Sequence, residues 1–282
     1  MNEQTPVTAE PLSELAVSLF QGSDVRKFLQ GYLTCDTDLL LPGETALPAA
    51  LCNLKGRVVA NGWAAGYEDD HRIIVITHAS VAGTLREFLK KYLVFSKTTA
   101  SAWQPKAGLW GDVDNPNDRT GMILDSRRRL YFQPPSGQAS STERFFASLV
   151  RDQRVLIQAS TSEQFLPQML GLDQWGAVDF HKGCYLGQEV VARAQHRGQV
   201  KRQLVSLVQT NTAATVQPPA PGTALLDPQE NPAGIVVQSV ALQTPSAYPS
   251  ANVLAVVPQR TASDARLLHI AGEPGSRLSW PT

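Results

Sequence analysis

The sequence contains few cysteines and no long hydrophobic run. Its three cysteines, Cys35, Cys52 and Cys184, lie far apart and form no C-x-x-C pair. An odd number of scattered cysteines does not make a disulfide framework and fits a reducing compartment. No stretch approaches the ~18–20 consecutive apolar residues of a membrane span, and Glu3 stands where a signal peptide carries basic residues. We therefore expect a cytoplasmic protein without membrane contact.

The chain also lacks an excess of charge of either sign, with 25 Lys and Arg against 25 Asp and Glu. Non-specific nucleic-acid binding rests on excess positive charge, so the surface as a whole is not built for a polyanion. Two basic segments are predicted to be solvated faces rather than RNA contacts. They are residues 127–129 and a stripe of Arg193, His196, Arg197, Lys201 and Arg202. Direct RNA binding is an alternative that this composition does not support.

Several motifs of cofactor chemistry are missing as well. There is no G-x-x-x-x-G-K-[ST] loop and no G-x-G-x-x-G, so nothing indicates nucleotide binding. The five histidines have no zinc-type spacing with the cysteines, although His181 lies close enough to Cys184 to assist it. An iron–sulfur cluster normally takes four cysteines. We therefore expect no metal to be bound by this chain alone.

What the chain does contain is alternating helical and strand patterns. Its 282 residues, 43% of them hydrophobic, suggest two or three folding units. Helical spacing follows Ser23 or Asp24 and ends near Gly31, recurs over residues 85–92, and follows a capping-box pattern of Ser140 and Glu143. Strands are predicted within residues 47–59, 72–77, 108–113 and 122–132. This mixture indicates an α+β fold.

After Arg202 the pattern becomes purely β-rich. Short apolar runs are separated by Pro and Gly clusters such as residues 218–222, and helical spacing is absent. That is typical of a small all-β barrel or sandwich. We divide the chain into residues 1–110, interleaved with 111–202, and a C-terminal β-barrel over residues 203–282.

The candidate site is the segment at residues 182–189, Lys-Gly-Cys-Tyr-Leu-Gly-Gln-Glu. A helix is predicted from Gln188 to the residue before Gly198, which puts Cys184 on a loop just before a helix N-terminus. The helix dipole, together with Lys182, His181 and Arg193, would favour a thiolate there. The alternative is a buried cysteine with a packing role, and spacing alone leaves the two almost equal.

The neighbouring polar residues also have two interpretations. Glu189 and Arg193 are spaced i, i+4, which suits a surface ion pair; Gln188 suits a helix cap, and Lys182 a solvated loop. The functional alternative is a polar pocket that presents donors and one carboxylate to a heterocycle such as a pterin.

The segment matches K-G-C-Y-x-G-Q-E-x-x-x-R, the signature of the YgfZ family, in every specified position. Further motifs of that family resemble Gly22-Ser23-Asp24 with residues 28–36, residues 52–57, residues 90–97, and Phe165-Leu166-Pro167-Gln168. The resemblance spans about residues 12–202. It implies a three-domain cloverleaf similar to the glycine-cleavage T-protein, with tetrahydrofolate or a derivative in a central channel.

The resemblance further implies a folate-binding accessory protein for iron–sulfur enzymes such as tRNA methylthiotransferases, and thereby a role in tRNA modification. By the same resemblance Cys184 and Lys182 are the catalytic candidates, and Tyr185, Gln188, Glu189 and Arg193 the folate-binding ones. The alternatives are a one-carbon (aminomethyl) transferase and a protein that binds tRNA directly.

Two features depart from the family pattern. Leu15 and Phe145 occupy places where family members can carry folate-contacting tryptophans. Residues 151–155, Arg-Asp-Gln-Arg-Val, replace an R-x-G-x-P-like turn.

Overall fold

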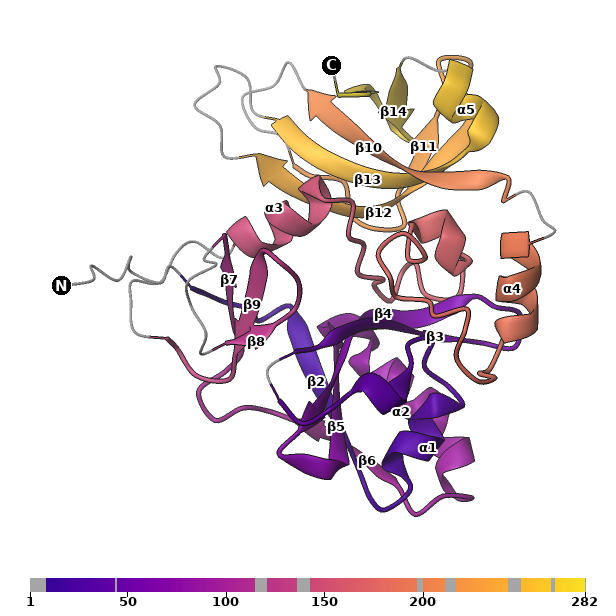
Figure 1. Ribbon diagram of the computed structural model, residues 1–282. Helices are drawn as coiled ribbons and strands as arrows, with labels where there is room; N and C mark the ends of the chain where they lie inside the picture. The colour runs from indigo at the N-terminus through magenta and orange to yellow at the C-terminus, as the bar shows by residue number, and fades with distance from the viewer. Residues whose placement is uncertain are drawn as a thin grey trace.

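The computed structural model describes residues 9–281 except 44, 115–120, 136–142, 197–199, 211–216, 243–249 and 265–266. The described chain forms three lobes, each built on its own antiparallel sheet (Figure 1). The predicted α+β class with a C-terminal all-β barrel is confirmed.

The first lobe is a five-stranded sheet with the order β3-β4-β5-β2-β6. Its strands are β2 (Leu15–Gln21), β3 (Leu47–Cys52), β4 (Val58–Tyr67), β5 (Asp69–His78) and β6 (Thr99–Trp103). The amphipathic helix α2 (Ala79–Leu93) packs against the sheet through Val81, Leu85 and Leu89, while α1 (Val25–Gln30) and the short η1 (Thr37–Leu39) follow β2. The predicted strand over residues 47–59 is in fact a hairpin, because residues 53–56 form a tight turn between β3 and β4.

The second lobe combines a short strand that precedes the first lobe in sequence with three strands that follow it. Its sheet has the order β1-β7-β9-β8, with β1 (Glu10–Pro11), β7 (Trp110–Val113), β8 (Met122–Ile123) and β9 (Arg128–Tyr131). Helix α3 (Arg144–Arg151) covers it. Ser140 of the predicted capping box lies outside the described residues, and the side chain of Glu143 makes no capping bond to α3. The two backbone N–H groups at that end, of Arg144 and Phe145, are bound by the carboxylate of Glu10.

The third lobe is a closed barrel with the order β10-β13-β12-β11-β14-β15. Its elements are β10 (Arg202–Thr210), β11 (Ala224–Leu226), β12 (Pro232–Leu242), β13 (Ser250–Pro258), α5 (Gln259–Asp264), β14 (Leu268–Ile270) and β15 (Glu273–Ser279). In β13, Val253, Ala255 and Val257 belong to the barrel interior, whereas Leu254 and Val256 belong to the core shared with the other lobes. Both faces of this strand are therefore buried, which explains its continuous apolar run.

An irregular segment, residues 155–157, connects the lobes at their centre. It is almost fully buried and belongs to no strand, so its backbone groups need other partners. Asn61 of β4 supplies two of them: its Nδ2 donates to the carbonyl of Val155 (2.6 Å), and its Oδ1 accepts from the N–H of Ile157 (2.8 Å). Gln238 of β12 accepts from the N–H of Leu156 (2.9 Å). Two side-chain amides thus fix this segment between the first lobe and the barrel.

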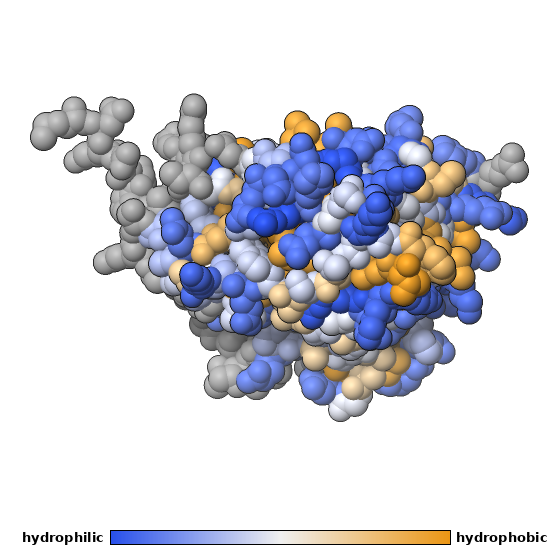
Figure 2. Space-filling model, turned by 90° about the horizontal axis from the view of Figure 1, so that it is seen from below, coloured by the Kyte–Doolittle hydropathy of each residue, from blue (hydrophilic) through white to orange (hydrophobic). Residues whose placement is uncertain are grey.

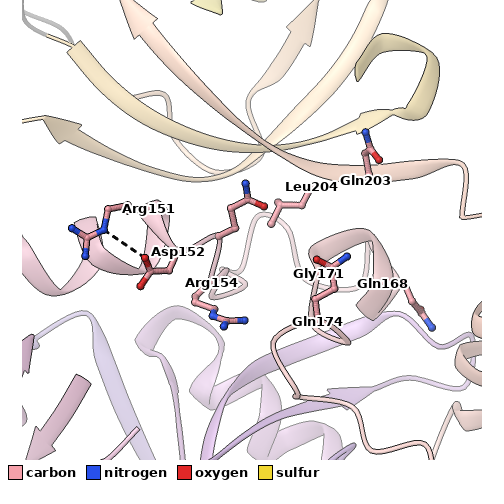
Figure 3. A pocket seen from close by; sticks show the side chains of 9 residues that line it. Arg151, Asp152, Arg154, Gln168, Gly171, Gln174, Gln203 and Leu204 are labelled. Carbon is pink, nitrogen blue, oxygen red and sulfur yellow. Dashed lines mark ion pairs between the residues drawn. The ribbon is translucent and has the colours of Figure 1, made fainter. Parts of the chain in front are cut away.

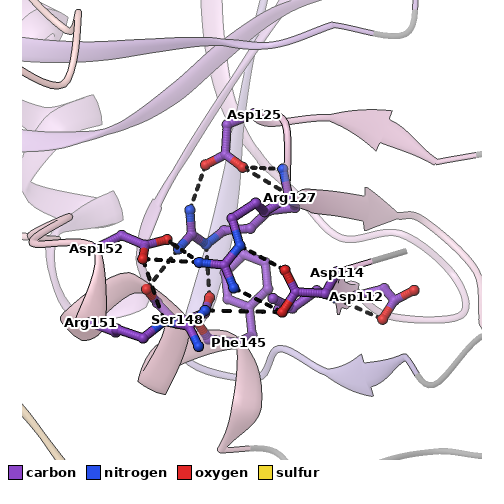
Figure 4. A network of polar contacts seen from close by, with 10 residues as sticks. Asp112, Asp114, Asp125, Arg127, Phe145, Ser148, Arg151 and Asp152 are labelled. Carbon is purple, nitrogen blue, oxygen red and sulfur yellow. Dashed lines mark hydrogen bonds and ion pairs between the residues drawn. The ribbon is translucent and has the colours of Figure 1, made fainter. Parts of the chain in front are cut away.

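A network of ion pairs and hydrogen bonds around the buried Arg128 organises the second lobe, and Figure 4 labels its partners Asp125, Ser148 and Asp152. The guanidinium of Arg128 donates to the Ser148 hydroxyl (2.8 Å) and carbonyl (2.7 Å), to Asp125 (2.6 Å) and to Asp152. Arg127 binds Asp114 through two bonds of 2.7 and 2.8 Å and also reaches Asp152. Burial by itself raises the pKa of Asp152, but the Arg128 hydrogen bond and the charges of nearby arginines bring this pKa below its ordinary value.

We expect Arg128→Met to lower the free energy of unfolding by about 2–3 kcal/mol, because the Ser148 carbonyl and the carboxylates of Asp125 and Asp152 lose the donors of a buried side chain. Asp152 has a lowered pKa in the folded state, so its contribution is present above the unfolded pKa, about 3.9, and is lost as pH falls through the folded pKa. Urea unfolding at several pH values measures both effects. Asp152→Asn should lose this part of the acid dependence, and the half-exposed Arg151→Met, as the control, should cost less than about 1 kcal/mol. An Arg128→Met protein of unchanged stability would contradict the assignment.

Candidate functional site

Lys182 ties the signature segment to the end of α1. Its ammonium donates to the carbonyl oxygens of Gln30 (2.9 Å), Leu33 (2.6 Å) and Cys35 (2.8 Å), and the residue is only 8% exposed. An ammonium group has three N–H donors, so all three are used by backbone carbonyls. Lys182 therefore holds two loops together instead of lying solvated on the surface.

Backbone hydrogen bonds extend this contact along both loops. The N–H of Asp179 donates to the carbonyl of Thr34 (2.9 Å), and the N–H of Leu186 donates to that of Gly31 (3.0 Å). The carboxylate of Asp179 accepts from the N–H groups of His181 (2.7 Å) and Lys182 (3.2 Å). The loop at residues 179–186 is thus anchored at both ends and braced in the middle.

Two glycines allow the next contact, between α4 (Gln188–His196) and the β3–β4 turn. Gly187 has a φ of +82°, and a Cβ there would lie 2.3 Å from the carbonyl oxygen of Asn53. Gly56 has a φ of +68°, and its Cβ would lie 3.0 Å from the Cβ of Val190. Any other residue at Gly187 would collide with backbone. The motifs at residues 30–36, 52–57 and 182–189 therefore form one packed unit.

Cys184 lies exposed on this braced loop, four positions before α4 begins at Gln188. No hydrogen bond or ion pair joins it to any residue that the structure describes. Cys35 and Cys52 are both buried, and burial raises the pKa of each thiol to about 12, although the charge of Lys182 opposes this at Cys35. Of the three cysteines, Cys184 alone offers its sulfur to solvent.

The other predicted site residues differ in exposure. Tyr185 is buried, its hydroxyl has no hydrogen-bond partner among the described residues, and burial raises its pKa. Gln188 is half-buried, whereas Glu189 and Arg193 are exposed and form no ion pair with each other in the described chain. These four residues lie close in sequence, around the start of α4, and none of them lines the cavity described next.

A cavity of about 420 Å³ lies between the second lobe and the barrel (Figure 3). Its walls come from the end of α3, from the region around η2 (Pro167–Leu170), and from the start of β10. The lining is mostly polar and comprises Arg151, Asp152, Gln153, Arg154, Gln168, Gly171, Gln174, Gln203 and Leu204. Neither Cys184 nor any other residue of the signature segment is among them.

Two lining residues carry buried polar atoms that no described residue satisfies. They are Nε of Arg154 and Oε1 of Gln168. The guanidinium of Arg154 lies 5.6 Å from the centre of the Trp175 ring, and burial lowers its pKa, although arginine remains charged at any physiological pH. Gln168 donates from Nε2 to the carbonyl of Val191 in α4 (2.9 Å). Both atoms are sealed from the open cavity, and ordered water is the usual partner of such buried groups.

Sequence reasoning did not identify this cavity, although it noted the segment that forms one wall. Residues 151–155 depart from the family's R-x-G-x-P turn, and Gln153 holds a φ of +54°, the left-handed conformation that favours the family's glycine. Phe145, considered as a substitute for a folate-contacting tryptophan, is fully buried against Trp63. Leu15 is also buried. The aromatic ring next to the cavity's arginine is instead Trp175.

Comparison with known proteins places the chain in a family. No family model matches it. The tRNA-modifying protein YgfZ of Sodalis glossinidius is 30% identical over 97% of this chain and 92% of its own length. The YgfZ proteins of Klebsiella pneumoniae (30% identical, 75% of this chain and 74% of theirs) and Escherichia coli O157:H7 (29%, 71% and 71%) agree. The chain belongs to the YgfZ family.

The fold of this YgfZ family member is also found in an enzyme of glycine cleavage. The crystal structure of aminomethyltransferase T from Bartonella henselae superimposes with a TM-score of 0.64 at 15% identity, and covers 99% of this chain and 86% of that one. The predicted T-protein-like architecture is thereby confirmed. In the described part of this YgfZ chain, no helix is long and apolar enough to cross a membrane, and no three His, Cys, Asp or Glu side chains are grouped to hold a metal ion.

Brief alkylation with iodoacetamide should modify one thiol in the folded protein, at Cys184, and all three after denaturation. In Lys182→Met the carbonyls of Gln30, Leu33 and Cys35 lose their donor, so we expect Cys35 to become reactive as well. Intact mass and peptide mapping measure both outcomes. Lys27→Met, which removes an exposed lysine from the adjacent helix, is the matched control and should leave the pattern unchanged. Rapid labelling of Cys35 in the wild-type protein would contradict this packing.

Proposed function

We propose that this protein is a folate-binding accessory factor that supports the assembly or repair of iron–sulfur enzymes, and through them tRNA modification. The observation that carries the proposal is an exposed thiol on a braced loop, in a fold shared with aminomethyltransferase T. The relatives named tRNA-modifying protein support the link to tRNA. Enzymes such as tRNA methylthiotransferases would be the clients.

The cavity between the lobes fits a reduced folate in size and chemistry. Its volume of about 420 Å³ falls within the ~300–1,000 Å³ usual for small-molecule sites. Arg154 and Arg151 would bind the carboxylates of a glutamate tail, and the amide side chains of Gln153, Gln174 and Gln203 would hydrogen-bond the pterin. Bound tetrahydrofolate would supply a carrier for one-carbon units. This assignment moves the expected folate contacts from Tyr185, Gln188, Glu189 and Arg193 to the cavity wall.

The lining favours binding over turnover as an aminomethyltransferase. Proton transfer needs a carboxylate or comparable base that is free to accept a proton. Asp152 is the carboxylate among the nine lining residues, and it is held by Arg127 and Arg128. Because those arginines lower its pKa, Asp152 is a poor proton acceptor near neutral pH. We therefore favour an accessory role over a one-carbon transferase.

Direct tRNA binding has less support than an indirect role. Arg127 and Arg128 are bound by Asp114, Asp125 and Asp152, so the cluster at residues 127–129 does not present three unpaired cations. Arg193, His196, Lys201 and Arg202 are exposed, which suits the solvated face expected of them, and Arg197 lies outside the described residues. The neutral net charge adds no long-range attraction for a polyanion.

Cys184 would be the reactive group of the accessory role, and Lys182 a positioning residue. A single thiol does not by itself complete the four-cysteine ligand set of a cluster. Cys184 would therefore supply one cluster ligand, and a client protein would supply the others. Lys182 would keep the loop in place, since its three donors already bind carbonyls.

Tetrahydrofolate binding tests the cavity. Arg151→Met and Arg154→Met should each weaken binding by about tenfold or more, because each removes a cation that a ligand carboxylate would use (~1.4 kcal/mol). Isothermal titration under anaerobic conditions measures the dissociation constants. Arg193→Met, which removes an exposed arginine from α4, is the matched control and should bind normally. If Arg193→Met loses binding and the cavity variants keep it, folate binds at the signature segment instead.

Client activity tests Cys184. In cells that lack the endogenous protein, we expect Cys184→Ala to abolish support of a tRNA methylthiotransferase, while the purified variant keeps its fold because the thiol makes no hydrogen bond to described residues. Quantifying methylthiolated nucleosides by mass spectrometry gives the readout. Cys52→Ala, which changes a buried cysteine of the first lobe, should retain activity in proportion to its stability. Full methylthiolation with Cys184→Ala would refute the role of the thiol.

A further inference from the structure

One residue of the cavity wall has an unusual backbone conformation. Gln153 lines the cavity and holds a φ of +54°, in the left-handed region. Residues other than glycine adopt this region at a cost in free energy, because their Cβ crowds the following carbonyl oxygen. Asparagine and aspartate adopt it more readily than glutamine does. A glutamine at this place therefore calls for a physical explanation.

The end of α3 explains the conformation of this residue but not its type. Helices often end in a Schellman motif, in which the residue after the C-cap is left-handed. Asp152 is the C-cap of α3, and the N–H of Gln153 donates to the carbonyl of Val150 (3.1 Å). The N–H of Arg154 donates to the carbonyl of Leu149 (2.8 Å), which completes the motif. Such a motif favours glycine at the left-handed position, so the glutamine side chain is an addition that the helix end does not require.

The other left-handed positions show what a side chain can gain there. In the part of the chain that the structure describes, four further non-glycine residues have a positive φ, and all four are acidic. The carboxylate of each contacts a neighbouring polar side chain. The pairs are Glu68 with Arg72, Asp114 with Arg127, Glu163 with Asn53, and Glu230 with His269. At these four places a polar contact within the chain offsets the backbone strain.

Gln153 is the exception among these five residues. Its side chain is exposed at the cavity and forms no hydrogen bond with any described residue. The amide therefore presents a carbonyl acceptor and an NH2 donor side by side, and both are free. A strained residue whose polar group has no partner within the described chain indicates a contact with a molecule outside the chain.

The residues on either side of Gln153 indicate how a ligand would be recognised. Arg151, Gln153 and Arg154 all line the same cavity. The two guanidinium groups suit carboxylates, whereas a primary amide suits an edge that carries one acceptor next to one donor. A pterin ring has such an edge, because its carbonyl oxygen at C4 lies beside the N–H at N3. A carboxylate could accept from that N–H but could not donate to the carbonyl oxygen.

We propose that Gln153 selects the pterin of a bound folate by pairing its amide with the C4 carbonyl and the N3–H of the ring. This role depends on the cavity being the folate site, as proposed above. Gln174 and Gln203 would add hydrogen bonds from backbone conformations without a positive φ. Gln153 would therefore recognise the ring, while the flanking arginines bind the tail. Glycine at this position would remove the strain and lose the recognition.

Gln153→Gly should change stability and binding in opposite directions. Glycine adopts the left-handed conformation without strain, so the midpoint of urea unfolding should rise. The amide is lost at the same time, so the dissociation constant for tetrahydrofolate should increase by about tenfold or more. A merely structural role of the side chain would instead lower stability and affinity together. Urea unfolding and anaerobic isothermal titration measure the two quantities.

Two further variants separate the amide from side-chain volume and from strain. Gln153→Glu keeps the length of the side chain and the strain of the backbone, and should also bind tetrahydrofolate about tenfold less tightly. Glu68→Gly relieves the same kind of strain in the turn between β4 and β5, and should bind as the wild-type protein does. That turn belongs to the first lobe, which Figure 2 shows from below, with hydrophobic side chains exposed among hydrophilic ones.

A fragment of the ligand separates the role of Gln153 from the folate site itself. The fragment p-aminobenzoylglutamate has the tail of folate but no pterin, so Arg154→Met should weaken its binding and Gln153→Gly should not. If neither Arg151→Met nor Arg154→Met affects tetrahydrofolate binding, the cavity is not the folate site and both proposals are wrong. If those variants lose binding while Gln153→Gly or Gln153→Glu keeps it, only the role of Gln153 is wrong. A Gln153→Gly protein less stable than the wild-type protein would also contradict this role.

Discussion

The candidate site depends on one buried ammonium group and the three carbonyl oxygens that surround it. Lys182 binds the carbonyls of Gln30, Leu33 and Cys35, which end α1 and begin the next loop. These oxygens are removed from water and have no equivalent donor without the lysine, so the contact is costly to break. This contact fixes the position of the loop around residue 182 relative to the loop around residue 33. The exposed position of Cys184 follows, because its loop has little freedom to fold inward.

Lys182 and Cys184 are neighbours in the signature with different kinds of role. A lysine beside a cysteine suggests that the cation lowers the thiol's pKa, and the sequence prediction was built on that pairing. The three donors of Lys182 are directed to backbone carbonyls, which a sequence does not display. Packing also explains the glycine at position 187 of the same segment, because Gly187 lies against the Asn53 carbonyl. In this signature Cys184 is accessible to solvent, whereas Lys182 and Gly187 hold the surrounding backbone in place.

Sequence patterns predicted the features that depend on local periodicity. The helix from Gln188, the amphipathic helix at residues 85–92 and the C-terminal barrel are of this kind. The cavity was not predicted because its walls come from three separate segments of the chain, which contact one another only in the folded protein. No local sequence pattern marks Arg154 as a cavity residue. The positive φ of Gln153 was not predicted because glutamine rarely adopts that conformation. The β3–β4 hairpin was taken for one interrupted strand because its turn at residues 53–56 lies between two apolar runs.

The segment at residues 155–157 has a consequence for how this molecule can be divided. Its backbone is satisfied by Asn61 from one lobe and Gln238 from another, and Arg154 directly precedes it. The cavity therefore has no wall that a single lobe would preserve in isolation. Without either of those lobes, backbone groups of this buried segment would lose their partners. The shape of the cavity beside it is then a property of the assembled chain, even if every sheet can form alone.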